Sequence, residues 1–491
     1  MPPMDLSDIG YDAFLINGRR ESRLASLKQH QTVRLRLINA AASTYFNVKL
    51  AGAPMTVIAA DGADVQKIST SEILMGMAET YDVIVSIHEN KDYELRATNQ
   101  DSRGFASAWL GVDGAEKTYV ADSSPISLYT PMNHSQMGHT QMNHTNIDHS
   151  SMDHSQMDHT QMNHSQMNHT DTTGNSTGTI TVDQLKSLTK STISSGQKLV
   201  ELKMTLDGDM ARYVWFINEK TITEDRTITI SEGDIVRINI KNTTMMHHPM
   251  HLHGHFFRVL TAAQDYSPLK HTVDVPPHGE RTIEFLANEP GIWMLHCHNL
   301  YHMKSGMARI VEYAGYPVAP EIKHMASHDP HSHEHIYNFA SVAAFTSHAE
   351  LQARASRTRD QVELRAETNK GDNDWQTNAD VFYRRWQSNF FSVLGGATVF
   401  EHETRGLIGA SYQLPFLVES QFFIDTKGKG RLDLAKSFQW TTHIRSDFEL
   451  RARDSELTDW QTNLVYANSW NLSYGLNFSD RNIGAGLIYK F

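Results

Sequence analysis

The sequence is poor in several features that would otherwise guide its interpretation. It has one cysteine in 491 residues, Cys297, so no disulfide can form within the chain. No apolar run reaches the length of a membrane-spanning helix, and the opening residues Met1–Leu6 lack the basic and apolar regions of a secretion signal. The net charge of −12 argues against a nucleic acid as partner.

Long helical periodicity is also scarce, whereas short alternating segments separated by turn residues are common. This pattern predicts a mainly β protein. A chain of 491 residues is too long for one hydrophobic core, and about three domains are expected.

The lone cysteine stands in an unusual setting. It lies between His296 and His298, with His302 and Met307 following within ten residues. A thiolate, imidazoles and a weak thioether are the ligands of a trigonal electron-transfer copper site with a long axial methionine. If the segment is a strand, Cys297 faces one side and both flanking histidines face the other. One strand could then serve two metal centres.

A second histidine-rich stretch begins about fifty residues upstream, at residues 248–255. His251 and His253 share one face of a strand by the same alternation, and His248 stands at its entry. Any one of these histidines alone would more often be a surface or core residue than a ligand. Their combination with the His-Cys-His segment favours metal binding.

The two stretches resemble the copper motifs in the last domain of multicopper oxidases, H-P-x-H-L-H-G and H-C-H-x3-H-x4-M. The surrounding sequence, over roughly residues 10–315, is similar to the bacterial copper-resistance protein A family. The resemblance implies a type 1 copper site of His248, Cys297, His302 and Met307. It also implies His251 as a type 2 ligand and His253, His296 and His298 as type 3 ligands. No catalytic residue beyond the metal ligands is expected.

The same resemblance implies the organisation of the first two thirds of the chain. After an N-terminal remnant at 1–10, residues 11–120 resemble the middle cupredoxin domain, and residues 199–315 resemble the copper-bearing one. The domain at 11–120 contains no H-x-H pair, so we expect it to be a structural spacer without copper ligands.

A low-complexity tract at 131–170 lies within the linker 121–198. It has too few core-forming residues to fold and should be disordered. The alternative to copper capture is a plain linker, but thioether and imidazole in register suit copper ions. The candidate ligands are Met132, His134, Met137, His139, Met142, His144, Met152, His154, Met157, His159, Met162, His164, Met167 and His169.

A second histidine-rich linker is expected at 316–335, and the pattern changes after it. Residues 336–491 alternate polar and apolar residues over about ten positions, with aromatic residues near the segment ends. This is typical of an outer-membrane β-barrel, apolar outside and polar inside. Segments such as residues 414–420 resemble the outer-membrane copper-resistance protein B family. The alternative is a soluble, lipocalin-like barrel.

The sequence therefore predicts a copper-handling protein of the periplasm and outer membrane of a Gram-negative bacterium. By resemblance its activity is oxidation of Cu(I) or phenolic reductants with O2, and its partners are Cu(I)/Cu(II) ions, O2 and the outer membrane. The alternative is copper sequestration without turnover. The family's cluster needs eight histidines, and no H-x-H pair precedes residue 131. We therefore expect that a first domain and an export signal are missing and that oxidase activity is impaired.

Overall fold

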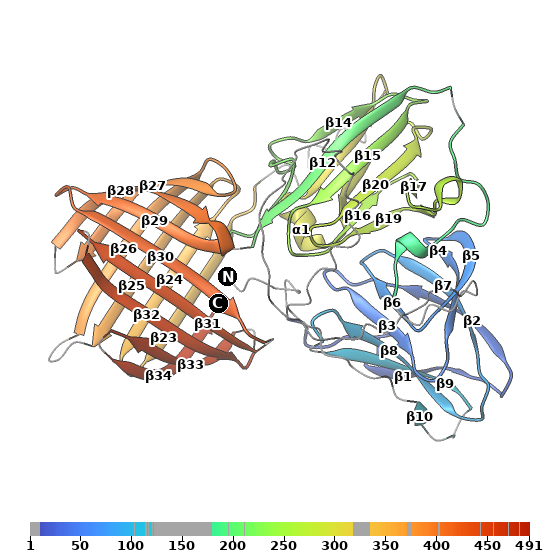
Figure 1. Ribbon diagram of the computed structural model, residues 1–491, viewed down its shortest axis with the longest axis horizontal. Coiled ribbons are helices and arrows are strands. Elements are labelled where there is room, and N and C mark those ends of the chain that lie inside the picture. Colours follow the sequence, from blue (N-terminus) through green and yellow to red (C-terminus); the bar gives the residue numbers. More distant parts are fainter. Residues whose placement is uncertain are drawn as a thin grey trace, which may run out of the picture.

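The computed structural model describes residues 10–121, 179–317 and 334–491, apart from short gaps at 103, 113–114, 116, 120, 195, 211, 371–374, 401–402, 442, 455, 470 and 481. Figure 1 shows two β-sandwich units side by side, with a separate barrel next to them. Two cupredoxin-like sandwiches followed by a closed antiparallel barrel confirm the fold class predicted from the sequence.

The first sandwich consists of two sheets. One has the strand order β1-β9-β8-β3-β6-β11, and β10 also pairs with β8. The other has the strand order β2-β7-β4-β5. Alternation along the strands builds its core, since Tyr81, Val83 and Val85 of β7 all point inward. The strands are β1 Glu21–Ser26, β2 Thr32–Ile38, β3 Phe46–Leu50, β4 Met55–Ala60, β5 Ala63–Thr70, β6 Glu72–Met75, β7 Thr80–Ser86, β8 Asp92–Asn99, β9 Phe105–Gly111, β10 Lys117–Tyr119 and β11 Thr179–Ile180.

The second sandwich pairs a sheet of order β13-β12-β15-β20-β17-β18 with one of order β14-β22-β21-β16-β19. Its strands are β12 Leu199–Asp209, β13 Val214–Ile217, β14 Thr227–Ile230, β15 Ile235–Asn242, β16 His248–Leu252, β17 Phe257–Val259, β18 Leu269–Lys270, β19 Thr272–Val275, β20 Glu280–Leu286, β21 Ile292–Cys297 and β22 Ala308–Tyr313. The helix α1, Leu300–Lys304, follows β21, and 3₁₀ helices occupy Val182–Gln184, Gln264–Tyr266 and, in the barrel, Pro415–Leu417.

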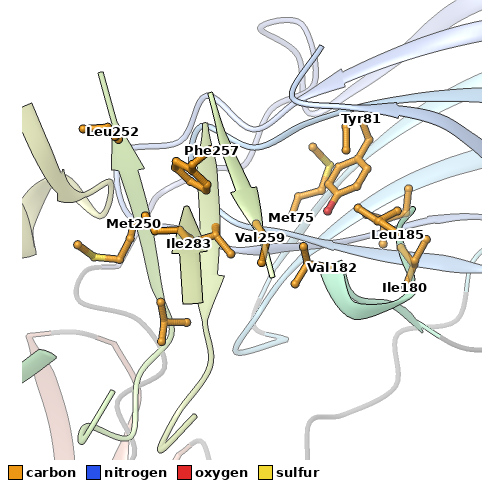
Figure 2. Packing of buried hydrophobic residues seen from close by; sticks show 14 of the residues in the cluster. Met75, Tyr81, Ile180, Val182, Leu185, Met250, Leu252, Phe257, Val259 and Ile283 are labelled. Carbon is orange, nitrogen blue, oxygen red and sulfur yellow. The ribbon is translucent and has the colours of Figure 1, made fainter. Parts of the chain in front are cut away.

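The two sandwiches share one continuous hydrophobic core. Figure 2 shows part of this core, with Tyr81 of the first unit on the right and Met250 and Phe257 of the second on the left. Residues 179–187, which were predicted to belong to the linker 121–198, take part in this core. There β11 pairs with β6, and Val65 bridges to Ser187.

A buried ionic cluster also joins the two units. The ammonium group of Lys270 lies 3.2 Å from Asp61 Oδ2 and 3.1 Å from Glu79 Oε1, and all three side chains are buried. Burial opposes the charge of Lys270, but the two carboxylates raise its pKa, so the cation is retained. The two sandwiches are therefore fixed against each other by ion pairs as well as by apolar packing.

The barrel closes through pairing of its first and last strands, as in Ser341↔Lys490. Along each strand, charged residues face the interior and large apolar residues face outward, with Ile408 69% and Ile483 73% exposed. The strands are β23 Tyr337–Phe345, β24 His348–Ser356, β25 Asp360–Lys370, β26 Trp375–Trp386, β27 Phe391–Phe400, β28 Glu403–Leu414, β29 Val418–Asp425, β30 Gly430–Gln439, β31 Ile444–Arg453, β32 Glu456–Ala467, β33 Leu472–Ser479 and β34 Ile483–Lys490.

Polar contacts connect the second sandwich to one end of the barrel. Arg359, in the turn between β24 and β25, pairs with Glu224 at 2.8 Å. Arg212 Nη1 donates to the Thr358 carbonyl at 3.0 Å, and its guanidinium lies over the Trp386 ring. Both termini of the barrel lie at this same end, since an even number of strands returns the chain to it. Within the described ranges, no helix is long and apolar enough to cross a membrane.

Candidate metal centre

Two neighbouring strands, β16 and β21, bring the two sequence motifs together. They are antiparallel, with Met250 opposite Cys297 and His251 opposite His296. The His298 amide then donates to the Pro249 carbonyl at 2.6 Å, which extends the contact past the end of β21. Stretches about fifty residues apart are thus held in a fixed register.

The first group of ligands is compact and buried. Cys297 Sγ lies 3.7 Å from His248 Nδ1 and 3.7 Å from His302 Nδ1, and the two Nδ1 atoms are 3.1 Å apart. All three side chains are fully buried. Met307 is also fully buried, and its carbonyl accepts the Cys297 amide at 3.0 Å. The four residues predicted for the type 1 site therefore gather at one place.

A threonine fixes the orientation of His248. Thr244 Oγ1 lies 2.8 Å from Asn242 Oδ1, which can only accept, so the hydroxyl proton points there. The same oxygen lies 2.7 Å from His248 Nε2 and must accept from it. The proton of the imidazole is then on Nε2, and Nδ1 presents its lone pair toward Cys297.

His302 is positioned by the short helix α1 and by an aromatic neighbour. Asn299 caps the helix, since its side chain accepts the amides of Tyr301 and His302, and Ser43 of the first sandwich donates to that same Asn299 oxygen at 3.0 Å. Trp215 stacks on the His302 ring with centroids 3.7 Å apart and meets His248 edge-on. These contacts keep water out and hold both imidazoles.

The second group contains the four histidines predicted for the cluster. His253 Nε2 lies 3.1 Å from His296 Nε2, and the nearest ligand atoms of His251, His253 and His296 all fall within 4.8 Å of one another. The ring of His298 lies 5.5 Å from that of His251 and 5.3 Å from that of His296. Its Nδ1 is buried without a hydrogen-bond partner in the described part of the chain.

Burial keeps these histidines neutral, which is the form that binds metals. It lowers the pKa of His251 to about 4 and that of His296 to about 3. It also lowers the pKa values of His253 and His298. The ring of His251 is also oriented by a hydrogen bond between its Nδ1 and the His271 carbonyl oxygen, 2.8 Å away.

The donor sets fit copper. Two imidazole nitrogens and one thiolate converging in a buried trigonal arrangement, with a methionine beside them, are the ligands of an electron-transfer copper site. The adjoining group of imidazoles, with an orphaned buried nitrogen, suits further copper ions. Among the described residues, three or more potential metal ligands converge at these two places.

Several supporting residues were not predicted from the sequence. Thr244, Trp215 and Asn299 contact the ligands or position them, yet none belongs to a motif. Tyr45 of the first sandwich donates to Asp274 at 2.7 Å, and Asp274 pairs with His247, the residue before His248. The predicted ligands of the tract 131–170, and His324, His328, His331 and His333 of the second linker, lie outside the described residues.

Comparison with known families agrees with this site. Residues 196–314 and 4–115 each match the multicopper oxidase family. The first match contains every ligand of the two groups described above. Two regions of the chain are therefore similar to multicopper oxidase domains, and members of that family bind copper.

Curated relatives include multicopper oxidase MmcO from Mycobacterium tuberculosis, 31% identical over 311 residues, which cover 63% of this chain and 52% of the relative. Copper resistance protein A from Pseudomonas syringae pv. tomato is 33% identical over 374 residues, which cover 63% of this chain and 61% of the relative. The chain thus spans between half and two thirds of the length of these relatives. The crystal structure of Fet3p, a multicopper oxidase that functions in iron import, matches with a TM-score of 0.44 at 15% identity. The match covers 64% of this chain and 63% of Fet3p.

Proposed function

We propose that this chain, which has two regions similar to multicopper oxidase domains and is homologous to copper resistance protein A, takes electrons from Cu(I) or a phenolic reductant and delivers them toward O2. The observation that supports this most directly is the juxtaposition of two ligand groups along one strand. Cys297 belongs to the buried trigonal group, and its chain neighbour His296 belongs to the histidine group.

The residues of the chain perform distinct tasks in this proposal. His248, Cys297, His302 and Met307 would hold a type 1 copper, which supplies one-electron redox chemistry when bound. Burial of the Cys297 thiol and the stacked Trp215 exclude water from this group. The peptide bonds from Cys297 to its two histidine neighbours give a covalent electron path to the second group, formed by His251 (type 2) and His253, His296 and His298 (type 3).

The alternative function is copper sequestration without turnover, and one observation favours it. The described residues bring four histidines to the cluster, half of the eight that the family requires. A copper ion with too few ligands is bound weakly. We therefore propose that the 491-residue polypeptide binds type 1 copper but reduces O2 slowly by itself.

Oxygen uptake distinguishes the two functions. The copper-loaded polypeptide should consume O2 negligibly with a cuprous or phenolic substrate, and uptake should rise when a domain bearing two H-x-H pairs is added. Substitution Cys297→Ser should abolish that rise. Uptake by the polypeptide alone at ordinary enzymatic rates would contradict the incomplete cluster, and no rise with any added domain would favour sequestration.

We also propose that the barrel inserts in the outer membrane, as the sequence segments that resemble copper-resistance protein B suggest. The support is its inverted polarity, because Ile408 and Ile483 face outward while Arg384 and Arg431 are buried inside. The second sandwich contacts the end where both barrel termini lie, the periplasmic end in such barrels. The purified chain should require detergent to remain monomeric, and a monodisperse monomer without detergent would contradict insertion.

A further inference from the structure

The interior of the barrel is filled by long charged side chains. About eight strands already give an interior that side chains just fill, and this barrel closes with twelve. A barrel of this width can enclose a water-filled channel unless long side chains cross it. Here the lumen-facing side chains of three arginines and three acids are between 2% and 8% exposed, which a water-filled channel would not allow: Arg384, Arg431, Arg451, Glu363, Glu367 and Asp380.

One layer of ion pairs crosses the lumen. Arg451 of β31 pairs with Glu367 of β25, which is six strands away in a ring of twelve and so belongs to the opposite wall. Asp433 of β30 lies 3.3 Å from the Nε atom of Arg451 and 3.3 Å from that of Arg431. Arg431 Nη1 in turn donates to Asp380 Oδ1 of β26 at 3.1 Å. The layer therefore joins β30 and β31 to β25 and β26 across the interior.

Aromatic rings fill the interior beside this layer. Phe382 of β26 and Phe423 of β29 are buried and stack with their centroids 5.1 Å apart. The guanidinium group of Arg431 lies over the Phe423 ring, 4.4 Å from its centroid. Leu394 and Leu407 complete this apolar cluster. Side chains from strands that are not neighbours in the barrel thus meet inside it.

A second set of ion pairs lies closer to the sandwiches. Arg384 Nη1 of β26 donates to Glu419 Oε1 of β29 at 3.3 Å, and Arg384 Nη2 lies 3.6 Å from Glu363 Oε2 of β25. A cavity, partly open to solvent, begins among the turns at the opposite end, at Ser347 and Asn482, and reaches inward to Glu419. Arg384 is not part of the cavity lining, so this cavity ends at the Arg384–Glu419 pair.

We propose that the barrel is a sealed membrane anchor for the two sandwiches, closed by these two sets of ion pairs, and that it conducts neither metal ions nor small solutes. The proposal rests on the membrane insertion proposed above and adds that the inserted barrel is closed. Separating a buried pair leaves uncompensated charges, so the two sets hold the lumen shut. Copper bound by the second sandwich then stays on that side of the membrane.

The ion conductance of the full chain in planar lipid bilayers bathed in KCl tests the seal. The wild-type chain should add no stepwise current. A variant that removes one acid and one base from each set should conduct, and its interior keeps the same net charge: Arg384→Ser, Glu363→Ser, Arg451→Ser and Glu367→Ser. The matched control, with serine in place of two exposed ion pairs, should add no current: Arg385–Asp360 and Lys429–Asp454.

Flotation of the same samples with lipid vesicles distinguishes a failed seal from failed insertion. A chain that does not float with the vesicles would overturn the insertion, and the seal with it. Stepwise current from a wild-type chain that floats would overturn the seal alone, and this result needs no variant that folds. A fourfold variant that floats but is as silent as the control would show that these ion pairs do not close the lumen.

Discussion

At the scale of single residues, the ligands depend on neighbours that set their protonation and direction. Thr244 determines which nitrogen of His248 faces Cys297, and Trp215 packs against both histidines proposed for the type 1 site. Residues that contact the ligands in this way account for much of the affinity of a metal site. The motif alone would leave the imidazoles free to rotate or to bind through the other nitrogen.

Replacing Thr244 by valine should weaken type 1 copper binding by roughly 10- to 100-fold, because His248 loses the acceptor for its Nε2 proton. The affinity is measured by titration with a copper chelator. Thr243→Val is the matched control, since the Thr243 hydroxyl donates to the Leu206 carbonyl instead. Equal affinities for the two variants would show that Thr244 does not orient His248.

The lowered pKa values of the cluster histidines predict an acid-sensitive metal-free protein. Unfolded histidines bind protons near pH 6.5, whereas His251 does so near 4 and His296 near 3 in the folded chain. Stability is therefore fully present above pH 6.5 and is lost as the pH falls through 6.5 toward these values. Calorimetry of the metal-free chain at pH 7 and pH 5 should show a lower Tm at pH 5, and His296→Gln should reduce the difference.

A pH-independent Tm over this range would contradict the predicted burial of neutral histidines. Metal-loaded protein provides the comparison, because bound copper competes with protons for the same nitrogens.

At the scale of elements, local patterns were informative and long-range pairings were not. The alternation of residues 336–491 predicts barrel strands because each strand has one polar and one apolar face. The His-Cys-His motif predicts two metal groups because neighbouring residues in a strand face opposite ways. The placement of 179–187 on the first sandwich could not be predicted, because a two-residue strand has no periodicity of its own.

The tract 131–170 provides a prediction at this scale. Deleting it should reduce the number of Cu(I) or Ag(I) ions bound per chain without changing the blue absorption expected of the Cys297 group, because the residues proposed for the type 1 site lie outside the tract. Lowering the pH below 6.5 should weaken the histidine share of the binding to the tract, since ordinary imidazoles then become protonated. Metal analysis after equilibrium dialysis measures both effects. Identical stoichiometry with and without the tract would make it a plain linker.

At the scale of the whole molecule, the three units are joined by specific contacts. Lys270 of the second sandwich is buried between Asp61 and Glu79 of the first, and Arg359 of the barrel pairs with Glu224. The sequence gives no sign of these pairs, because their members are distant in the chain and each belongs to a common residue type. The first sandwich is consequently more than a spacer, since Ser43 and Tyr45 also reach the residues that support the ligands.

Lys270→Met should destabilise the pair of sandwiches by about 3–5 kcal/mol, because two buried carboxylates lose their counterion. Thermal unfolding measures the change. Lys190→Met is the control, since the Lys190–Asp265 pair is solvent-exposed and its loss should leave Tm unchanged. Equal effects of the two substitutions would contradict the role given to the buried cluster.

The visible and paramagnetic spectra of the copper-loaded chain test most directly whether Cys297, His248 and His302 hold a type 1 copper. We expect an intense blue thiolate-to-copper absorption with the narrow hyperfine splitting of such sites. Both signals should vanish in Cys297→Ser, which removes the thiolate and keeps the histidines. A Cys297→Ser protein that remains blue would show that Cys297 is not the copper ligand.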